Sequence, residues 1–218
     1  MAGGDIRPAA FGETYRLKIT IRNVRPAVWR QLEVAGSTSL YELHEAIQTA
    51  FGWFDAHLHE FRIDGRNIGE PDPEWDREVP VEDDRRAFLA LVGLSVGGRF
   101  LYLYDFGDGW EHDIEVEAIE PAGARIRYPR VLGGARACPP EDVGGPLGYS
   151  DFLKAYRDPR NDEHEAMVEW AGPEFDPGHF DPRDVNDAFD MLEQLKADRR
   201  AVQRAKRAAA KKKAPRST

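Results

Sequence analysis

Residues 99–119 read RFLYLYDFGDGWEHDIEVEAI, and this stretch decides the fold. Its two halves, residues 99–106 and 110–119, are the best strand sequences in the chain. Between them lies Gly107-Asp108-Gly109, and a tight hairpin turn needs positive φ angles that Gly and Asp tolerate. The stretch therefore predicts an antiparallel β-hairpin.

The N-terminal half predicts a second hairpin, a helix and a further strand. Apolar residues alternate with polar ones at residues 15–21 and 57–63, as in half-buried strands, and residues 28–34 form the returning strand of the hairpin. Ser39 lies three residues before Glu42, a capping box that starts a helix. Hairpin, helix and strand in this order indicate a β-grasp-like unit.

The second half of the chain becomes helical towards its end. Residues 70–86, rich in Pro, Asp and Glu, predict an exposed loop, and residues 125–132 predict another strand. Ser150 is expected to cap a short helix, residues 162–170 a second one, and Asp181 with Pro182 marks the start of the last. The expected fold class is α+β, a mostly antiparallel sheet with helices packed on it and a basic helical C-terminal tail.

Charge divides the chain into a body and a tail. The net charge of the 218 residues is −9, yet residues 196–218 hold ten Lys or Arg and one Asp, so the body carries about −18. We expect a flexible N-terminus at residues 1–14, a single domain at 15–195 and a basic tail at 196–218. An acidic body makes nucleic-acid binding by the body itself unfavourable, because phosphates repel it.

The sequence predicts a cytoplasmic protein. The first 15 residues hold no apolar stretch of signal-peptide length, and the longest apolar run, residues 87–96, is too short to cross a bilayer. The lone Cys138 excludes an internal disulfide and fits a reducing compartment.

Four segments together resemble a known family. They are Val28-Trp29-Arg30, the stretch from Leu43-His44-Glu45 to His57-Leu58-His59-Glu60-Phe61, the stretch from Tyr104 to His112, and the loop from Cys138 to Gly145. In this order they are similar to the plasmid pRiA4b ORF-3-like family, some of whose members are labelled passenger (TnpR-type) proteins of insertion sequences. The resemblance implies an α+β domain and a mobile-element context. The chain lacks a serine- or tyrosine-recombinase site, so the resolvase label is not inherited.

A set of polar residues near the hairpin forms the candidate pocket: His57, His59, Asp105, Asp108, His112, Cys138, Glu141 and Asp142. His57 and His59 lie two apart on a predicted strand and would project from one face. With His112 they could hold Zn²⁺. Alternatively, these histidines pair with carboxylates or backbone at the edge of the sheet, and Cys138 packs as a small hydrophobic residue.

Cys138 is a weaker candidate for a nucleophile. It precedes two prolines in a glycine-rich loop, and no helix start is predicted there to lower the pKa of its thiol. The carboxylates of the candidate pocket could act as an acid and a base or hold Mg²⁺, but Asp108 between two glycines is also ordinary turn chemistry.

The tail is a candidate contact for nucleic acid or for an acidic partner. Its cations include Arg199, Arg200, Arg204, Lys206, Arg207, Lys211, Lys212 and Lys213. Such a segment binds phosphates without sequence preference, or it only improves solubility or folds back on the acidic body.

Two functions therefore stay open. The first is a binding or accessory module, associated with mobile genetic elements, that uses the tail. The second is a metal-dependent enzyme that uses the His, Cys and carboxylate surface.

Overall fold

The structure, a computed structural model, describes residues 11–71, 80–172 and 174–213, and at residues 205 and 207–213 it describes the backbone alone. The main strands and helices in chain order are β1 (Glu13–Ile21), β2 (Trp29–Ala35), α2 (Leu40–Phe51), β3 (His59–Ile63), β4 (Arg66–Gly69), β5 (Val81–Asp83), β6 (Arg99–Tyr104), β7 (Trp110–Pro121), β8 (Arg130–Ala135), α3 (Gly145–Arg157), α4 (His164–Ala171) and α5 (Pro182–Lys213).

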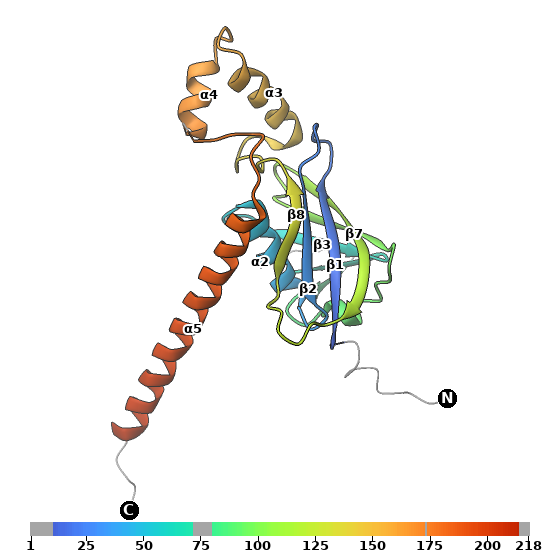
Figure 1. Ribbon diagram of the computed structural model, residues 1–218, viewed down its shortest axis with the longest axis vertical. Helices are drawn as coiled ribbons and strands as arrows, with labels where there is room; N and C mark the ends of the chain where they lie inside the picture. Colours follow the sequence, from blue (N-terminus) through green and yellow to red (C-terminus); the bar gives the residue numbers. More distant parts are fainter. Residues whose placement is uncertain (1–10, 72–79, 173, 214–218) are drawn as a thin grey trace, which may run out of the picture.

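The described strands form one sheet in the order β5-β4-β3-β6-β7-β1-β2-β8. All neighbouring pairs are antiparallel except β4 and β5, which are parallel. Together with the helices in Figure 1, this confirms the α+β class with a mostly antiparallel sheet. The strand that follows α2 does not pair with the first hairpin, because β6 and β7 lie between β3 and β1.

The sheet buries one face and exposes the other. Along β6, Phe100, Tyr102 and Tyr104 are buried while the residues between them are more exposed. The opposite face carries ion pairs between strands, such as Arg99 of β6 with Glu115 of β7 at 2.6 Å. Alternation of this kind is typical of an antiparallel sheet with one solvated face.

Helix α2 supplies apolar side chains to the same core as the buried face. Leu43 and Ile47 are fully buried in the core that also contains Leu17 of β1. The predicted capping box is present, since Ser39 and Glu42 each accept a hydrogen bond from the other's backbone N–H. Gly52 ends the helix at φ 82°, a left-handed conformation that Gly adopts without steric cost.

In the β6–β7 hairpin turn, the residues with positive φ angles are not all the ones that the sequence predicted. Positive φ angles occur at Asp105 (53°) and Gly109 (67°), and not at Gly107 or Asp108. The carboxylate of Asp105 accepts hydrogen bonds from the backbone N–H of Gly107 at 2.9 Å and of Asp108 at 3.3 Å. This local hydrogen bonding lets an aspartate take the left-handed position.

Three predicted boundaries are corrected by the structure. Strand β3 begins at His59, so His57 precedes it. Strand β8 begins at Arg130, directly after Pro129, which lacks an N–H for the ladder. Helix α3 begins at Gly145 and not near Ser150, because Gly144 caps it at φ 88° and a proline occupies its first turn.

The expected 70–86 loop contains strand β5, which pairs with β4 at the edge of the sheet. Residues 72–79 of that loop lie outside the described residues. An edge strand such as β5 is stabilised by pairing with a neighbouring strand. The local sequence, a run rich in Pro, Asp and Glu, therefore did not predict it.

Helices α3 and α4 lie beyond one end of the sheet (Figure 1). Their contact is aromatic, since the ring of Phe152 in α3 lies 5.7 Å from that of Trp170 in α4. Phe175, which follows α4, adds a second ring 5.6 Å from that of Phe152.

The first half of helix α5 contacts the body. Asn186 exchanges two hydrogen bonds with the backbone of Val131 in β8, and Lys196 lies 3.3 Å from Glu45 of α2. The 32-residue helix, about 48 Å long at 1.5 Å per residue, then leaves the sheet (Figure 1). Among the described residues, no helix has the length and hydropathy needed to cross a membrane.

Candidate functional site

A closed ring of hydrogen bonds lies under the loop that follows α2. Gln48 Nε2 donates to Tyr102 Oη at 3.0 Å, and Tyr102 Oη lies 2.7 Å from His44 Nδ1. His44 Nε2 lies 2.7 Å from Asp55 Oδ1, and the Asp55 backbone N–H donates to Gln48 Oε1 at 3.0 Å. Every donor meets an acceptor when His44 is neutral with its proton on Nε2. Burial lowers the pKa of His44 to about 4, consistent with this neutral form.

A second histidine stacks on this ring. The imidazoles of His44 and His59 are 3.6 Å apart between centroids and nearly parallel, at 6°. His59 Nε2 lies 2.8 Å from Asp84 Oδ2, and both of these side chains are buried. His59 is therefore occupied by a carboxylate and does not face an open surface.

His112 lies inside the core. It is fully buried, and its ring contacts Phe51 and Trp53 at 5.3 Å each. Its Nδ1 lies 3.1 Å from the carbonyl oxygen of Trp110. Burial lowers the pKa of His112 to about 4, so the ring is neutral near pH 7.

The Cys138–Gly145 loop is held against the β6–β7 hairpin. Glu141 Oε1 accepts hydrogen bonds from Tyr104 Oη at 2.7 Å and from the backbone N–H of Phe54 at 3.1 Å. Asp108 Oδ2 accepts from the backbone N–H of Gly144 at 3.1 Å. These bonds bring the loop, the hairpin turn and the end of α2 together.

His57, Asp105 and Asp142 meet where these segments join. His57 Nε2 lies 3.3 Å from Asp142 Oδ1 and 3.7 Å from Asp105 Oδ2. Neither contact has hydrogen-bond geometry, and Nε2 is buried without a hydrogen-bond partner among the described residues. The side chain of Asp142 is 75% exposed and that of Asp105 only 12%, so the cluster opens to solvent on the Asp142 side.

The spacing of the cluster suits a metal ion. One ligand atom from each of the three residues lies within 4.8 Å of the others, and no second group of this kind occurs among the described residues. Two ligands of a tetrahedral zinc ion, each about 2.1 Å from the metal, lie about 3.4 Å apart. The two distances from His57 are close to that value.

Comparisons with known proteins identify the family. The family model of the plasmid pRiA4b ORF-3-like protein matches residues 13–184. The chain belongs to the plasmid pRiA4b ORF-3-like family. It is 41% identical over 178 residues to "Uncharacterized protein y4hQ" of Sinorhizobium fredii (strain NBRC 101917 / NGR234), covering 81% of this chain and 91% of that protein.

A solved structure shares the family fold. The crystal structure of "Protein of Unknown Function MM3350" from Methanosarcina mazei Go1 matches with a TM-score of 0.74 and 36% sequence identity, covering 80% of this chain and 98% of that chain. Neither relative carries an activity in its name. The family therefore identifies the fold, and any activity has to be inferred from the residues of the site.

Three of the segments that resemble the family supply the cluster. His57 comes from the segment after α2, Asp105 from the hairpin and Asp142 from the Cys138–Gly145 loop. The family match ends at residue 184, so most of α5 and the tail cations lie beyond it.

The expected zinc trio is corrected by the structure. His57, His59 and His112 do not form a group of neighbouring ligand atoms among the described residues. His59 is paired with Asp84, and His112 lies in the core. Both side chains lie on the face of the sheet that packs against α2. His57 precedes the strand and faces the loops instead.

The other candidate residues hold the loops in place. Cys138 packs against the core, and burial raises the pKa of its thiol, so a thiolate nucleophile is disfavoured. Asp108 and Glu141 bind backbone N–H groups, as described above.

Sequence reasoning missed His44, Asp55 and Asp84 as partners. His44 lies one residue after Leu43 on the buried side of α2, where a polar residue in an apolar stripe signals a buried hydrogen-bond network. Asp55 and Asp84 lie in loops and carry no such signal.

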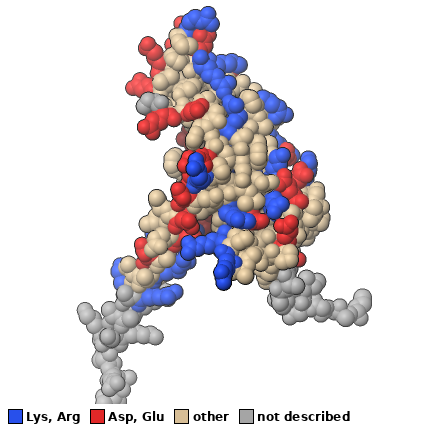
Figure 2. All heavy atoms as spheres, viewed as in Figure 1, with Lys and Arg blue, Asp and Glu red and all other residues tan. Residues whose placement is uncertain are grey.

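The described tail cations are exposed. Arg199, Arg200, Arg204 and Lys206 all lie on the solvent side, and Figure 2 shows Lys and Arg along the part of α5 that leaves the body. Arg200 lies 3.7 Å from Glu193, whereas Arg204 and Lys206 form no ion pair with a described residue. The side chains of Arg207, Lys211, Lys212 and Lys213 lie outside the described residues.

Proposed function

We propose that the protein binds one divalent metal ion through His57, Asp105 and Asp142 and acts as a metal-dependent enzyme. The observation that carries this proposal is the convergence of three ligand atoms from three loops within 4.8 Å. The buried, unbonded Nε2 of His57 supports it, because a buried polar atom without a partner is unfavourable unless something binds it.

The chemistry of the site follows from its ligand set. Three protein ligands leave a coordination position for water or substrate, as in catalytic zinc sites. The exposed side of Asp142 gives access to that position. When bound, the metal would lower the pKa of a coordinated water and polarise an oxygen of the substrate. One imidazole with two carboxylates suits Zn²⁺ or a similar ion of borderline softness.

Isothermal titration of EDTA-treated protein with ZnCl₂ tests the site. We expect one ion per chain and a loss of affinity of at least about 100-fold in His57→Ala and in Asp105→Asn. The Asn side chain keeps an oxygen for the N–H groups of Gly107 and Asp108 while replacing the oxygen that faces His57. The turn should therefore survive this substitution.

His179→Ala is the matched control. His179 lies 3.3 Å from Asp184 in an exposed pair, so it resembles the cluster in chemistry but lacks a third ligand. It should leave the titration unchanged. Equal affinity of the wild type and His57→Ala, or no stoichiometric ion in the wild type, would remove the proposal.

A second candidate function rests on α5. Its basic half extends past the body with exposed cations, as a polycation that contacts phosphates would. Arg204 and Lys206 form no ion pair with a described residue that would have to break first. In this role the protein is a binding or accessory module for nucleic acid or another acidic partner.

Binding to random duplex and single-stranded DNA, compared between the full chain and a chain ending at Leu195, tests this function. The full chain should bind more tightly, with log affinity falling linearly against log salt concentration. If both chains bind equally, the tail is not the contact. The link to mobile genetic elements is a proposal that rests on the family resemblance alone.

A further inference from the structure

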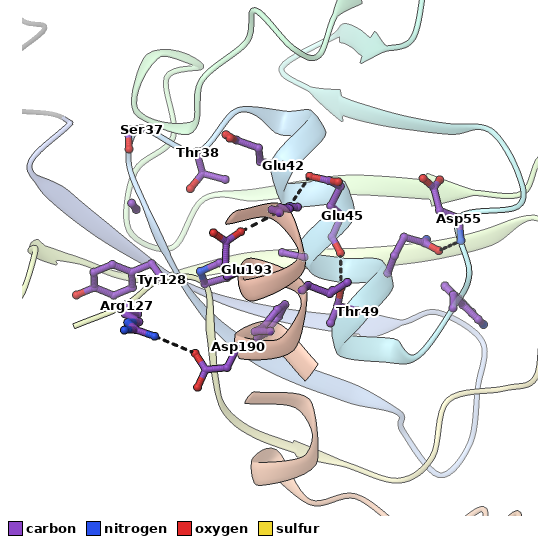
Figure 3. A pocket seen from close by; sticks show the side chains of 18 of the residues that line it. Ser37, Thr38, Glu42, Glu45, Thr49, Asp55, Arg127, Tyr128, Asp190 and Glu193 are labelled. Atoms are coloured by element: carbon purple, nitrogen blue, oxygen red, sulfur yellow. Dashed lines mark hydrogen bonds and ion pairs between the residues drawn. The ribbon is translucent and has the colours of Figure 1, made fainter. Parts of the chain in front are cut away.

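A cavity of about 590 Å³ lies between α2, α5 and the segment before β8. Figure 3 shows Glu42, Glu45 and Thr49 on the α2 wall, Asp190 and Glu193 on the α5 wall, and Asp55 at one end. The volume lies within the range of small-molecule pockets, about 300–1,000 Å³.

The charges of the cavity favour a cation. Five carboxylates and three cationic side chains line it, a net charge of −2. Each cation already has a carboxylate partner: Arg127 with Asp190, Lys196 with Glu45 and Glu193, and Arg200 with Glu193. No cation in this lining is therefore left to attract an anion.

Two of the five carboxylates, Glu42 and Asp55, have no Lys or Arg partner among the described residues. Glu42 is engaged in the capping box of α2, which leaves Asp55 as the counter-ion available to a ligand. Its one ion-pair contact among the described residues is His44 Nε2, and the hydrogen-bond ring holds that imidazole neutral. The side chain of Asp55 is 47% exposed, so its charge is open to the cavity. The ring through Gln48 and Tyr102 fixes the orientation of the carboxylate.

Three aromatic residues are among those that line the cavity. Trp53 and Phe54 directly precede Asp55 in the chain. Figure 3 shows Tyr128 on the side of the cavity away from Asp55. Aromatic faces attract organic cations, most strongly where water is excluded.

We propose that this cavity binds a small organic cation, an amine or quaternary ammonium compound, with Asp55 as its counter-ion. The site is separate from the metal cluster in its ligand atoms, although Asp55 and His57 lie two residues apart. It goes beyond the proposed function and does not require the metal.

Titration calorimetry of the full chain with choline and with putrescine, in the presence of EDTA, tests the site. We expect at least one of the two probes to bind with a dissociation constant in the millimolar range or tighter, and Asp55→Asn to weaken it at least about tenfold. Glu45→Gln on α2 lies outside the hydrogen-bond ring and should also weaken binding, because the cavity loses negative charge. Butyrate, which carries the opposite charge, should not bind.

Asp64→Asn is the matched control, since Asp64 is also an aspartate at positive φ, 48° against 55° for Asp55, but lies in the β3–β4 turn. It should bind both probes as the wild type does. The proposal is overturned if neither ammonium probe binds, if butyrate binds equally well, or if a folded Asp55→Asn variant binds the probes as tightly as the wild type does. Because EDTA is present throughout, failure here leaves the metal proposal untouched.

Discussion

At the scale of residues, four histidines near the candidate site have different roles. His44 and His112 are buried and neutral, His59 is paired with a buried aspartate, and His57 faces the surface cluster. Protonation of the two buried rings, His44 and His112, should therefore destabilise the fold, while metal binding should depend on His57.

The buried rings predict acid sensitivity. The pKa values of His44 and His112 are lowered to about 4 in the folded protein, below the usual 6.5 of an unfolded chain. Between these values the unfolded chain binds more protons, so stability is fully present above pH about 6.5 and falls towards pH about 4. Each ring contributes up to about 1.4 kcal/mol per pH unit. Urea unfolding from pH 7 to 5 should show this slope, reduced by about half in His112→Asn.

The hydrogen-bond ring predicts a cost for removing one hydroxyl. Tyr102→Phe leaves His44 and Gln48 without their buried partner, which should destabilise the fold by about 1–3 kcal/mol. Tyr149→Phe is the control, because the buried Tyr149 hydroxyl has no hydrogen-bond partner among the described residues. Urea unfolding at pH 7 should separate the two variants. Equal costs would contradict the ring.

At the scale of elements, two serines test where helices begin. Ser39 caps α2 with both bonds of a capping box, whereas Ser150 lies inside α3 and is exposed. Ser39→Ala should cost about 1 kcal/mol, within the range of 0.5–2 for cap removal. Ser150→Ala should be neutral or slightly stabilising, because Ala is the better helix former. A comparable loss in both variants, measured by thermal unfolding, would argue that Ser150 is a cap after all.

At the scale of the whole molecule, charge and contact divide the chain near Arg200. The body is acidic, and α5 carries the basic residues away from it (Figure 2). The described part of α5 beyond Arg200 makes no ion pair with the body. Exposed backbone of this kind opens locally at little cost in free energy.

Limited trypsin digestion should therefore remove the basic end of α5 first and leave a fragment close to residues 15–195. This outcome is expected of the single domain predicted from the sequence, whose strands share one core. A cut within residues 70–86 could accompany it. Two stable fragments that separate after cleavage near Cys138 would instead show two domains.

The local signals in the sequence predicted several elements closely. The capping box at Ser39, the glycine after α2 and the alternation of β6 and β7 all act over a few residues, and the structure contains each of them. These signals work because hydrogen bonds and apolar periodicity within one element do not depend on its neighbours. The family predicted from four segments was confirmed by the family model that matches residues 13–184.

The candidate site depended on contacts between distant segments. The sequence named His57, Asp105 and Asp142 among eight residues, but only the tertiary structure separated them from His59, His112 and Cys138. Side chains alternate between two faces only inside a strand, and β3 begins two residues later than predicted, so His57 lies outside it and does not share the face of His59. The strand order and the cavity beneath α5 likewise arise from packing between elements far apart in the chain. Composition and local pattern therefore determined most of the elements, whereas packing around a common core decided the edge strand β5 and which side chains meet.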